Sequence, residues 1–194
     1  MLKHRIIHRI KLVLEKLRGI EFSKITPVSE LGLDPKKVFH GSSSGGRELK
    51  TVISRLNIKD TDRILDIGSG KGGAINTFYT FPFERIDGVE ISKELVNITN
   101  NNIKKLNLKK TQIFCLNACE FSQYGSYNFF YLYNPFDLKT LKKTVLLIIA
   151  QQKHFTLIYN NPKWGNVLDD LGLMCSLKCL DLSAISSKYI NTAK

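Results

Sequence analysis

The sequence has no long hydrophobic run and few acidic residues. Its apolar stretches are shorter than the ~20 residues that a membrane-spanning helix needs, so we expect no transmembrane segment. The first residues are charged throughout and lack the apolar core of a secretory signal peptide. We therefore expect no such peptide and a cytoplasmic location. With 194 residues the chain is long enough for one domain with a substantial core.

The shortage of acidic residues leaves a basic chain. Lys and Arg number 29 against 17 Asp and Glu, which gives a formal net charge of +12. Such a charge attracts the phosphates of nucleic acid, and an anionic lipid or an acidic glycan would suit it equally well. The Lys and Arg are spread along the chain, without an arginine-rich tract or an array of alternating basic and aromatic residues. Nucleic acid therefore stays an open partner class that the sequence does not favour.

A cluster of glycines follows a short apolar segment. Residues Arg63–Ile67 are largely apolar and bounded by turn signals, which predicts a buried parallel strand. The glycines behind it are Gly68, Gly70, Gly72 and Gly73. Glycine can adopt positive φ and lets a ligand lie against bare backbone. A strand, a glycine loop and a helix in this order predict a nucleotide-type site at the carboxyl end of a parallel strand.

The glycine spacing fits two kinds of cofactor. It can be read as G-x-G-x-x-G, the dinucleotide fingerprint, or as G-x-G-x-G. The predicted second strand, Arg85–Glu90, ends in an acid about 20 residues after Gly68, where a carboxylate can bind ribose hydroxyls. NAD and S-adenosylmethionine (SAM) both contain that ribose, so Glu90 does not separate them.

Asp66 separates the two cofactors better. It lies at the end of the first strand, where its carboxylate suits the cationic amino group of SAM and would lie unfavourably close to the pyrophosphate of NAD. The stretch D-I-G-S-G-K-G that begins at Asp66 resembles motif I of the class I SAM-dependent methyltransferases. This resemblance implies that SAM is bound by Asp66, Gly68, Ser69, Gly70 and Glu90.

A wider resemblance, over Val38–Trp164, is to small bacterial class I methyltransferases of unassigned acceptor, which share D-x-G-S-G-K-G, G-V-E and N-P-F motifs. It implies an α/β, Rossmann-like sheet of seven strands, mostly parallel, with a C-terminal antiparallel hairpin and helices on both faces. The residue patterns predict further strands at 112–116, 127–133 and 154–161, a hairpin from 173–181 and 184–190, and helices at 46–56, 72–80, 92–106 and 137–150. A dehydrogenase would need a second nucleotide-binding half, for which this sequence leaves no room.

Two further segments are assigned to the cofactor by the same resemblance. Asn117 and Ala118 stand where many methyltransferases carry Asp-Ala beside the adenine ring, and an amide oxygen can still accept from the adenine amino group. A glycine–serine loop precedes the first strand, where related enzymes close a loop over SAM. Its Ser42, Ser43 and Ser44 could offer hydroxyls and N–H groups to the SAM carboxylate, with Ser43 at the centre. The alternative is a flexible linker.

Asn134, Pro135 and Phe136 follow the predicted fourth strand. They resemble the N-P-P-F and D-P-P-Y motifs of amino-methylating enzymes, in which a side chain and a backbone carbonyl accept from a planar amine and the ring stacks on it. The sequence has one proline instead of two and Phe in place of Tyr. A strand-terminating turn, with Asn134 bonded to local backbone, is the equally weighted alternative.

These features predict an enzyme that moves a methyl group from SAM to an unidentified acceptor, for which an amine of a protein or a small molecule is suitable. Two alternatives stay open. One is a non-catalytic SAM-binding module that acts through a partner, and the less favoured one is an NAD-dependent oxidoreductase.

The N-terminus reads as a basic amphipathic helix that ends at Gly19. Such a helix can lie on an anionic membrane, but packing on its own domain with solvated charges is the favoured interpretation. We expect three parts: this helix over 1–20, a lead-in loop and helix over 21–60, and the SAM-binding catalytic domain over 61–194.

Four cysteines form two C-x-x-x-C pairs, Cys115/Cys119 and Cys175/Cys179, which could make a zinc site. In the expected fold the first pair belongs to the third strand and the second to the last hairpin, on opposite halves of the sheet. We therefore expect reduced, partly buried cysteines and no metal site.

Overall fold

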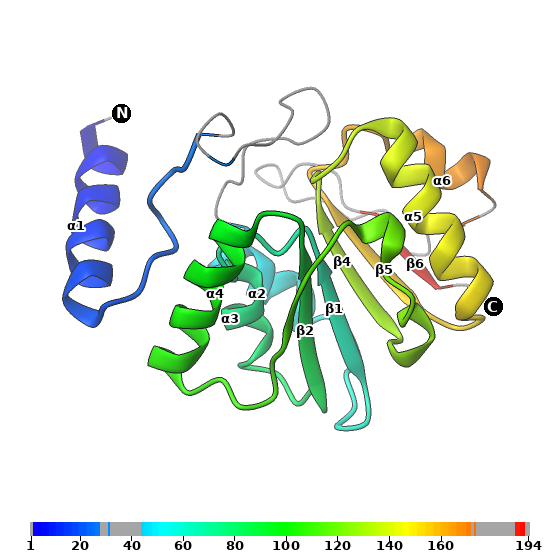
Figure 1. Ribbon diagram of the computed structural model, residues 1–194, viewed down its shortest axis with the longest axis horizontal. Coiled ribbons are helices and arrows are strands. Elements are labelled where there is room, and N and C mark those ends of the chain that lie inside the picture. The colour runs from blue at the N-terminus through cyan, green and yellow to red at the C-terminus, as the bar shows by residue number, and fades with distance from the viewer. Residues whose placement is uncertain (1, 28–30, 32–43, 172, 174–188, 193–194) are drawn as a thin grey trace.

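The computed structural model describes residues 2–27, 31, 44–171, 173 and 189–192. Its centre is one sheet with the strand order β3-β2-β1-β4-β5-β6 (Figure 1). The strands are β1 (Arg63–Ile67), β2 (Arg85–Glu90), β3 (Ile113–Cys115), β4 (Phe129–Tyr133), β5 (Thr156–Asn160) and β6 (Tyr189–Thr192). The first five are mutually parallel, and β6 runs antiparallel to β5.

The chain order reverses at β1, which pairs with β2 on one side and with β4 on the other. In open parallel sheets such a reversal leaves room for a ligand outside the carboxyl ends of the strands. The glycine loop follows the carboxyl end of β1, so the fold places it at this switch point.

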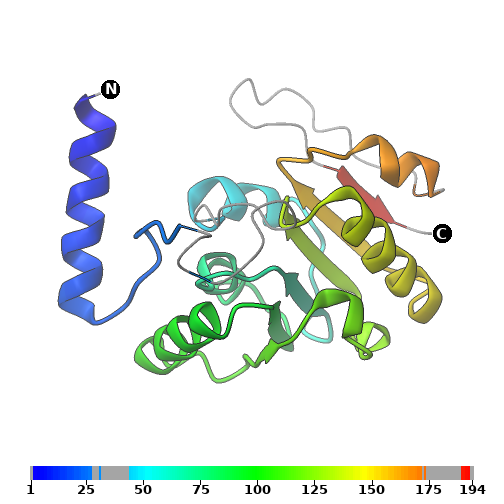
Figure 2. The same ribbon diagram turned by 45° about the horizontal axis from the view of Figure 1, so that its top comes forward.

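Helices cover both faces of the sheet (Figures 1 and 2). On one face lie α2 (Arg47–Ile53), α3 (Gly73–Phe78) and α4 (Lys93–Leu106); on the other lie α5 (Leu138–Gln151), the short helix α6 (Asn166–Asp170) and the 3₁₀ turns η2 (Ala118–Glu120) and η3 (Tyr124–Ser126). The N-terminal helix α1 (Leu2–Arg18) stands beside this body.

Each face of the sheet has its own apolar core. Leu65, Phe130 and Leu157 point toward α5, whose Leu141 and Val145 are buried against them. The opposite core holds Ile64, Tyr131 and Ile158 together with α2 and α3, and the α2 side chains buried there are Leu49, Val52 and Ile53. The alternation of core sides along β1, β4 and β5 is what buried parallel strands require.

The predicted α/β fold with parallel strands and helices on both faces is confirmed, and the helix starts predicted at 92 and 137 are observed. Ser92 caps α4 by accepting from the Leu95 N–H at 3.3 Å, and Asp137 caps α5 by accepting from the Thr140 N–H at 2.8 Å. The predicted C-terminal hairpin falls mainly on 174–188, outside the described residues, so the count of seven strands stays a prediction. The short elements α6, η2 and η3 were not predicted because they have too few residues to show a period.

The prediction that α1 packs its apolar side on its own domain is wrong. Six apolar side chains of α1 are between 45 and 79 % exposed: Ile6, Ile7, Ile10, Val13, Leu14 and Leu17. The helix instead meets the body through its C-terminal half, where Leu12 and Glu15 are partly buried and Ile20, just beyond it, is buried. Within the described residues, no helix combines the length and the apolar character needed to cross a bilayer.

Candidate functional site

The loop between β1 and α3 is shaped by three glycines in the left-handed region. Gly68, Gly70 and Gly72 have φ values of 80°, 53° and 79°, which side chains with a Cβ rarely adopt. The N–H groups of Gly68 and Ser69 both donate to the carbonyl of Val89, at 2.8 and 3.1 Å. The loop therefore turns across the end of β2 before α3 begins.

The surroundings of two of these glycines differ sharply. A Cβ on Gly68 would lie 2.5 Å from the Cβ of Pro135, so the glycine loop and the segment after β4 are in direct contact. A Cβ on Gly70 would have nothing within 4 Å. The structure thus brings the predicted cofactor loop against the predicted acceptor motif and leaves open space in front of Gly70.

Glu90, at the end of β2, is buried and faces the glycine loop. Its Oε2 accepts from the Gly70 N–H and its Oε1 from the Ser92 N–H, both at 2.9 Å. Burial raises the pKa of this carboxyl, although its backbone donors act in the opposite direction. A carboxylate can accept about four hydrogen bonds, so Glu90 retains acceptor capacity for a ligand.

Asp66 is 2 % exposed, and its Oδ2 has no hydrogen-bond partner among the described residues. Burial raises the pKa of this carboxyl well above its ordinary value, and the nearby charge of Glu90 raises it further. Ser69 Oγ is a second buried atom without such a partner, and it lies where a Cβ on Gly88 would be 2.7 Å away. Buried polar atoms are normally paired, so these two point to a ligand that completes them.

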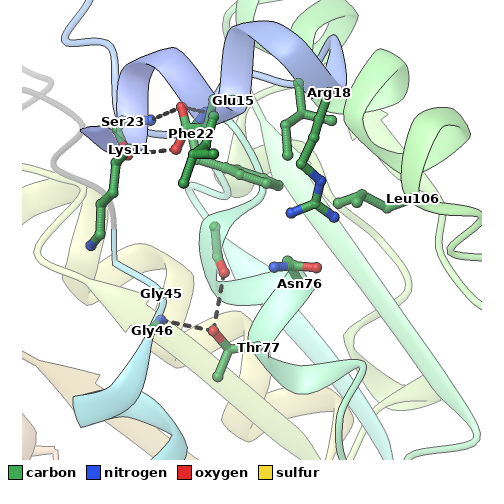
Figure 3. Close-up of a pocket in the computed structure, with 13 residues that line it drawn as sticks. Lys11, Glu15, Arg18, Phe22, Ser23, Gly45, Gly46, Asn76, Thr77 and Leu106 are labelled. Carbon is green, nitrogen blue, oxygen red and sulfur yellow. Dashed lines mark hydrogen bonds between the residues drawn. The ribbon is translucent and has the colours of Figure 1, made fainter. Parts of the chain in front are cut away.

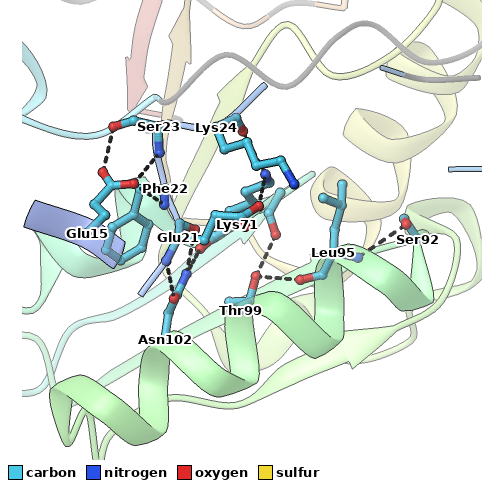
Figure 4. Close-up of polar contacts among 11 residues, drawn as sticks. Glu15, Glu21, Phe22, Ser23, Lys24, Lys71, Ser92, Leu95, Thr99 and Asn102 are labelled. Atoms are coloured by element: carbon cyan, nitrogen blue, oxygen red, sulfur yellow. Dashed lines mark hydrogen bonds and ion pairs between the residues drawn. The ribbon is translucent and has the colours of Figure 1, made fainter. Parts of the chain in front are cut away.

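Lys71, in the middle of the glycine loop, contacts residues of the segment that follows α1 (Figure 4). Its Nζ forms an ion pair with Glu21 and donates to the carbonyl of Lys24 at 2.7 Å. Asn102 of α4 joins the same network: its amide donates to the carbonyls of Glu21 and Lys71, and its Oδ1 accepts from the Glu21 N–H. Thr99 adds a hydrogen bond to the Gly70 carbonyl at 2.6 Å.

Glu15 ties α1 to the same segment. Its carboxylate accepts from the N–H groups of Phe22 and Ser23 and from the Ser23 hydroxyl, at 2.6 to 3.0 Å (Figure 4). The segment after α1 is therefore linked to α1 at one end and to the glycine loop at the other.

Asn134 directly follows β4 with a φ of 44°, and its Oδ1 accepts from the Tyr159 hydroxyl of β5 at 3.1 Å. Its side chain is thus held by the neighbouring strand. Pro135 packs on Gly68, since a Cβ built on Gly68 would lie 2.5 Å from the Pro135 Cβ. Phe136 is partly buried against the α5-side core. These contacts fix the segment in place, and its role toward an acceptor stays a prediction.

Asn117 caps the turn η2, with its Oδ1 accepting from the Cys119 N–H at 2.9 Å. This uses the oxygen that was predicted to accept from adenine, although a carbonyl oxygen has a second lone pair. Ala118 is buried in the α5-side core. The adenine assignment of both residues stays a prediction.

The lead-in loop reaches the glycine loop at its described end. A Cβ on Gly45 would lie 2.0 Å from the Gly73 carbonyl oxygen, and the Gly46 N–H donates to Thr77 Oγ1 at 2.9 Å. Ser44 accepts at its carbonyl from the Tyr131 hydroxyl at 3.2 Å. Ser43, the predicted partner of the SAM carboxylate, lies outside the described residues, as does Ser42.

A separate pocket of about 310 Å³ lies between α1, the segment after it and the start of α3 (Figure 3). Lys11, Glu15, Arg18, Phe22 and Asn76 are among its lining residues. None of the predicted SAM-binding residues lines it, so it is distinct from the candidate site.

The described residues contain no cluster of His, Cys, Asp or Glu that could hold a metal ion. Cys115 is exposed and Cys119 partly buried, both as free thiols. The second predicted pair, Cys175 and Cys179, lies outside the described residues, so the zinc alternative is not tested.

Sequence reasoning missed the residues that support the loop from behind, chiefly Lys71, Thr99 and Asn102. Lys71 stood inside the recognised motif, and Asn102 sits in a run of polar residues without a pattern of its own. The hydroxyl of Tyr131 was also missed; it accepts from the Asn160 amide at 3.0 Å, and burial raises its pKa above the ordinary value. The one available signal for this network was Asn102, a polar residue on the buried side of α4.

The sequence model of the protein-L-isoaspartate(D-aspartate) O-methyltransferase family matches residues 39–131, slightly less than half of the chain. The matched region contains the glycine loop, Glu90 and Asn117 and ends before Asn134. A search of the curated proteins gave no match.

Several solved structures share the fold. A SAM-dependent methyltransferase from Aquifex aeolicus matches with a TM-score of 0.63 and 12 % identity, over 76 % of this chain and 90 % of that one. An RNA methyltransferase from Salinibacter ruber, in complex with S-adenosyl-L-homocysteine, matches with a TM-score of 0.59 and 18 % identity, over 75 % and 90 %. Precorrin-6y C5,15-methyltransferase from Geobacter metallireducens GS-15 matches with a TM-score of 0.57 and 18 % identity, over 76 % and 87 %.

The structural similarity shows the fold, which is that of the SAM-dependent methyltransferases. Together the family match and the structures support the predicted enzyme class, SAM-dependent methyltransferase, and the predicted cofactor. They do not select an acceptor, because the methyltransferases among them are named for different ones.

Proposed function

We propose that this chain binds SAM at the carboxyl ends of β1 and β2 and transfers its methyl group to an acceptor held beside Asn134. The observation that carries the proposal is the pair of buried carboxylates, Asp66 and Glu90, at the glycine loop. Asp66 has an oxygen without a described partner, and Glu90 retains acceptor capacity. A ligand with an ammonium group and vicinal hydroxyls would satisfy both, and SAM has these groups.

The residues present fit that cofactor. Glu90 would accept from the ribose hydroxyls, and Asp66 would face the amino group of the methionine portion. Gly70 leaves its side of the loop open, because nothing lies within 4 Å of where its Cβ would be. Asn117 and Ala118 remain the proposed neighbours of the adenine, and Ser43 of the SAM carboxylate.

SAM supplies, when bound, a methyl group that is already activated by its sulfonium. The chain then has to orient the acceptor and exclude water, and it needs no metal for this task. A general base matters only where the acceptor atom carries a proton. We assign no base.

The acceptor side of the proposal rests on Asn134, Pro135 and Phe136. Asn134 Oδ1 already accepts from Tyr159, and its second lone pair is suited to an N–H of an amine acceptor. The contact between Pro135 and Gly68 couples this segment to the cofactor loop, so a shift in one displaces the other. An amine of a protein or a small molecule is therefore the acceptor class that we favour.

Calorimetric titration of the purified chain with SAM, S-adenosylhomocysteine and NAD tests the cofactor. We expect both sulfur compounds to bind and NAD not to bind. Glu90→Ala should weaken SAM binding by about tenfold or more, because it removes a charged acceptor from the site. Glu94→Ala, which removes an exposed carboxylate from the first turn of α4, is the matched control. Binding of NAD without SAM would overturn the proposal.

Release of S-adenosylhomocysteine in the presence of candidate acceptors tests the transfer. The acceptor panel holds amines, an isoaspartyl peptide and RNA. Asn134→Ala should lower turnover with an amine while leaving the calorimetric SAM affinity within about twofold, because the groups that lose a partner are the acceptor and the Tyr159 hydroxyl, not the cofactor. Unchanged turnover in this variant would remove Asn134 from the acceptor site. SAM binding without turnover on any acceptor would favour a non-catalytic SAM-binding module.

A further inference from the structure

The apolar side of α1 forms a continuous exposed stripe. Ile6, Ile10, Val13 and Leu17 follow each other at helical spacing, with exposures of 50, 53, 59 and 79 %. A water-soluble domain does not normally present so many large aliphatic side chains on one helix face. The stripe is therefore a surface that something covers, and we call it the α1 stripe.

Cations border the α1 stripe on both sides. At 100° per residue, Arg5, Arg9 and Lys16 fall along one edge, and Lys11 and Arg18 fall along the other. All five are exposed, and Lys11 and Arg18 also line the pocket between α1 and the body (Figure 3). A helix with an apolar face and flanking cations can lie in the interface of an anionic bilayer. Its apolar face then contacts the acyl chains, and its cations contact the headgroup phosphates.

The one acidic residue of α1 does not disturb this pattern. Glu15 lies on the side of the helix away from the stripe and accepts three hydrogen bonds from Phe22 and Ser23. Its charge is thereby directed toward the body. The stripe and its two edges are left with positive charge alone.

The attachment of α1 leaves the stripe free for a planar surface. The helix is held at its C-terminal end, where the carbonyl of Gly19 accepts from Asn101 and Ile20 is buried. Both views show the helix to one side of the α/β body, joined to it through the segment that follows (Figures 1 and 2). A flat surface can therefore contact the stripe along the length of the helix.

We infer that α1 docks this protein on an anionic lipid surface, with the α1 stripe in the headgroup–acyl boundary and the edge formed by Arg5, Arg9 and Lys16 on the phosphates. A second copy of the chain suits the stripe less well, because a two-fold pairing would bring like charges together along both edges. Nucleic acid would use the cations but leave the aliphatic side chains uncovered. The inference is independent of the proposed methyl transfer.

Co-sedimentation of the full chain with vesicles tests the inference. The probes are vesicles of phosphatidylcholine mixed with phosphatidylglycerol and vesicles of phosphatidylcholine alone. We expect binding to the mixed vesicles, little binding to the neutral ones, and a decline with added salt. Equal binding to both vesicle types, or no binding to the mixed ones, would overturn the inference.

Two variants separate the stripe from its edges. Ile10→Ser with Leu17→Ser should lower the vesicle partition coefficient by at least about tenfold, because it removes apolar area that enters the bilayer. Arg5→Gln, Arg9→Gln and Lys16→Gln together should lower it by about tenfold or more through lost charge. None of these five residues lines the pocket beside α1, and all are exposed, so the fold should be retained.

Each variant has a matched control elsewhere on the surface. Ile25→Ser with Leu146→Ser removes two aliphatic side chains that are 67 and 51 % exposed. Lys139→Gln, Lys142→Gln and Lys143→Gln remove three exposed cations from α5 and change the net charge equally. Both controls should bind vesicles within about twofold of the parent chain.

Two further results would contradict the inference. Concentration-dependent dimerisation that Ile10→Ser with Leu17→Ser abolishes, without vesicle binding, would assign the stripe to a second copy. RNA binding lost in the three-cation α1 variant, again without vesicle binding, would assign the edges to nucleic acid. Vesicle binding equal in the α1 variants and their controls would show that another surface carries it.

Discussion

Asp66 and Glu90 show what a ligand must supply at the candidate site. Both carboxyls are buried, and burial raises the pKa of each. Glu90 is partly compensated by the N–H groups of Gly70 and Ser92, whereas Asp66 has one oxygen without a described partner. The ligand-free protein thus keeps an acceptor that costs stability, which is common where a site is organised for binding.

Asp66→Asn should stabilise the ligand-free protein at neutral pH by about 1–3 kcal/mol, because it removes a buried carboxyl that ionises in the unfolded chain and whose ionisation the fold disfavours. The folded protein holds the Asp66 proton more tightly than the unfolded chain does. The free energy of unfolding of the unsubstituted protein should therefore fall as pH rises above the ordinary carboxyl pKa of about 4. The fall should continue up to the raised pKa of Asp66 in the folded state. The variant should lack this fall. Urea unfolding over a pH series measures both effects.

The same substitution should weaken SAM binding by about tenfold or more, since a neutral amide attracts an ammonium group less strongly. Asp60→Asn, at an exposed position, is the control and should change neither property. A loss of stability in Asp66→Asn with unchanged SAM affinity would show that Asp66 serves the fold alone.

Gly68 and Gly70 should respond differently to alanine. Gly68→Ala meets Pro135 at 2.5 Å and adds strain at a φ of 80°, so we expect a loss of about 3 kcal/mol in unfolding free energy. Gly70→Ala should cost only the backbone strain at a φ of 53°, about 1 kcal/mol of unfolding free energy. It also places a methyl group in the open space beside the loop. Calorimetry should therefore show a larger loss of SAM affinity, relative to stability, for Gly70→Ala. The reverse order would place the ligand elsewhere.

At the scale of elements, the segment after α1 supports the glycine loop on the side away from Glu90. We call this segment, which carries Glu21 and Lys24, the strut. Lys71 pairs with Glu21, and Asn102 of α4 binds both residues through their backbone. A partly buried network of this kind favours one arrangement when its members are paired. The loop is thus positioned from the cofactor side by Glu90 and from the opposite side by the strut.

Asn102→Ala should lower the free energy of unfolding by about 1–2 kcal/mol, because it leaves partly buried backbone groups of Glu21 and Lys71 without partners. Asn100→Ala, at an exposed position of the same helix, is the matched control. Urea titration measures both. Equal stability of the two variants would show that the strut does not hold the loop.

The sequence predicted those elements whose signals are local. The glycine loop, the acid at the end of β2 and the helix starts at 92 and 137 each depend on a few adjacent residues, and all are observed. The strut joins segments that are far apart in sequence, so no local pattern indicated it. The period of α1 showed that an apolar face exists but not which surface covers it.

Across the whole molecule, two surfaces of different chemistry lie at different places. The candidate site gathers carboxylates and a glycine loop at the switch point of the sheet, whereas α1 carries an apolar stripe between cations. The net charge of +12 favours approach of the whole protein to anionic surfaces, and the acidic residues at the sheet favour a cationic ligand there. Basic character alone therefore did not identify the ligand of the site.

A crystal structure of the chain grown with S-adenosylhomocysteine tests the central claim most directly. We predict that the ribose lies against Glu90, that the amino group faces Asp66 Oδ2, and that the ligand covers Gly70. Density for the ligand in the pocket beside α1, or any arrangement that leaves Asp66 and Glu90 without contact to it, would contradict the account.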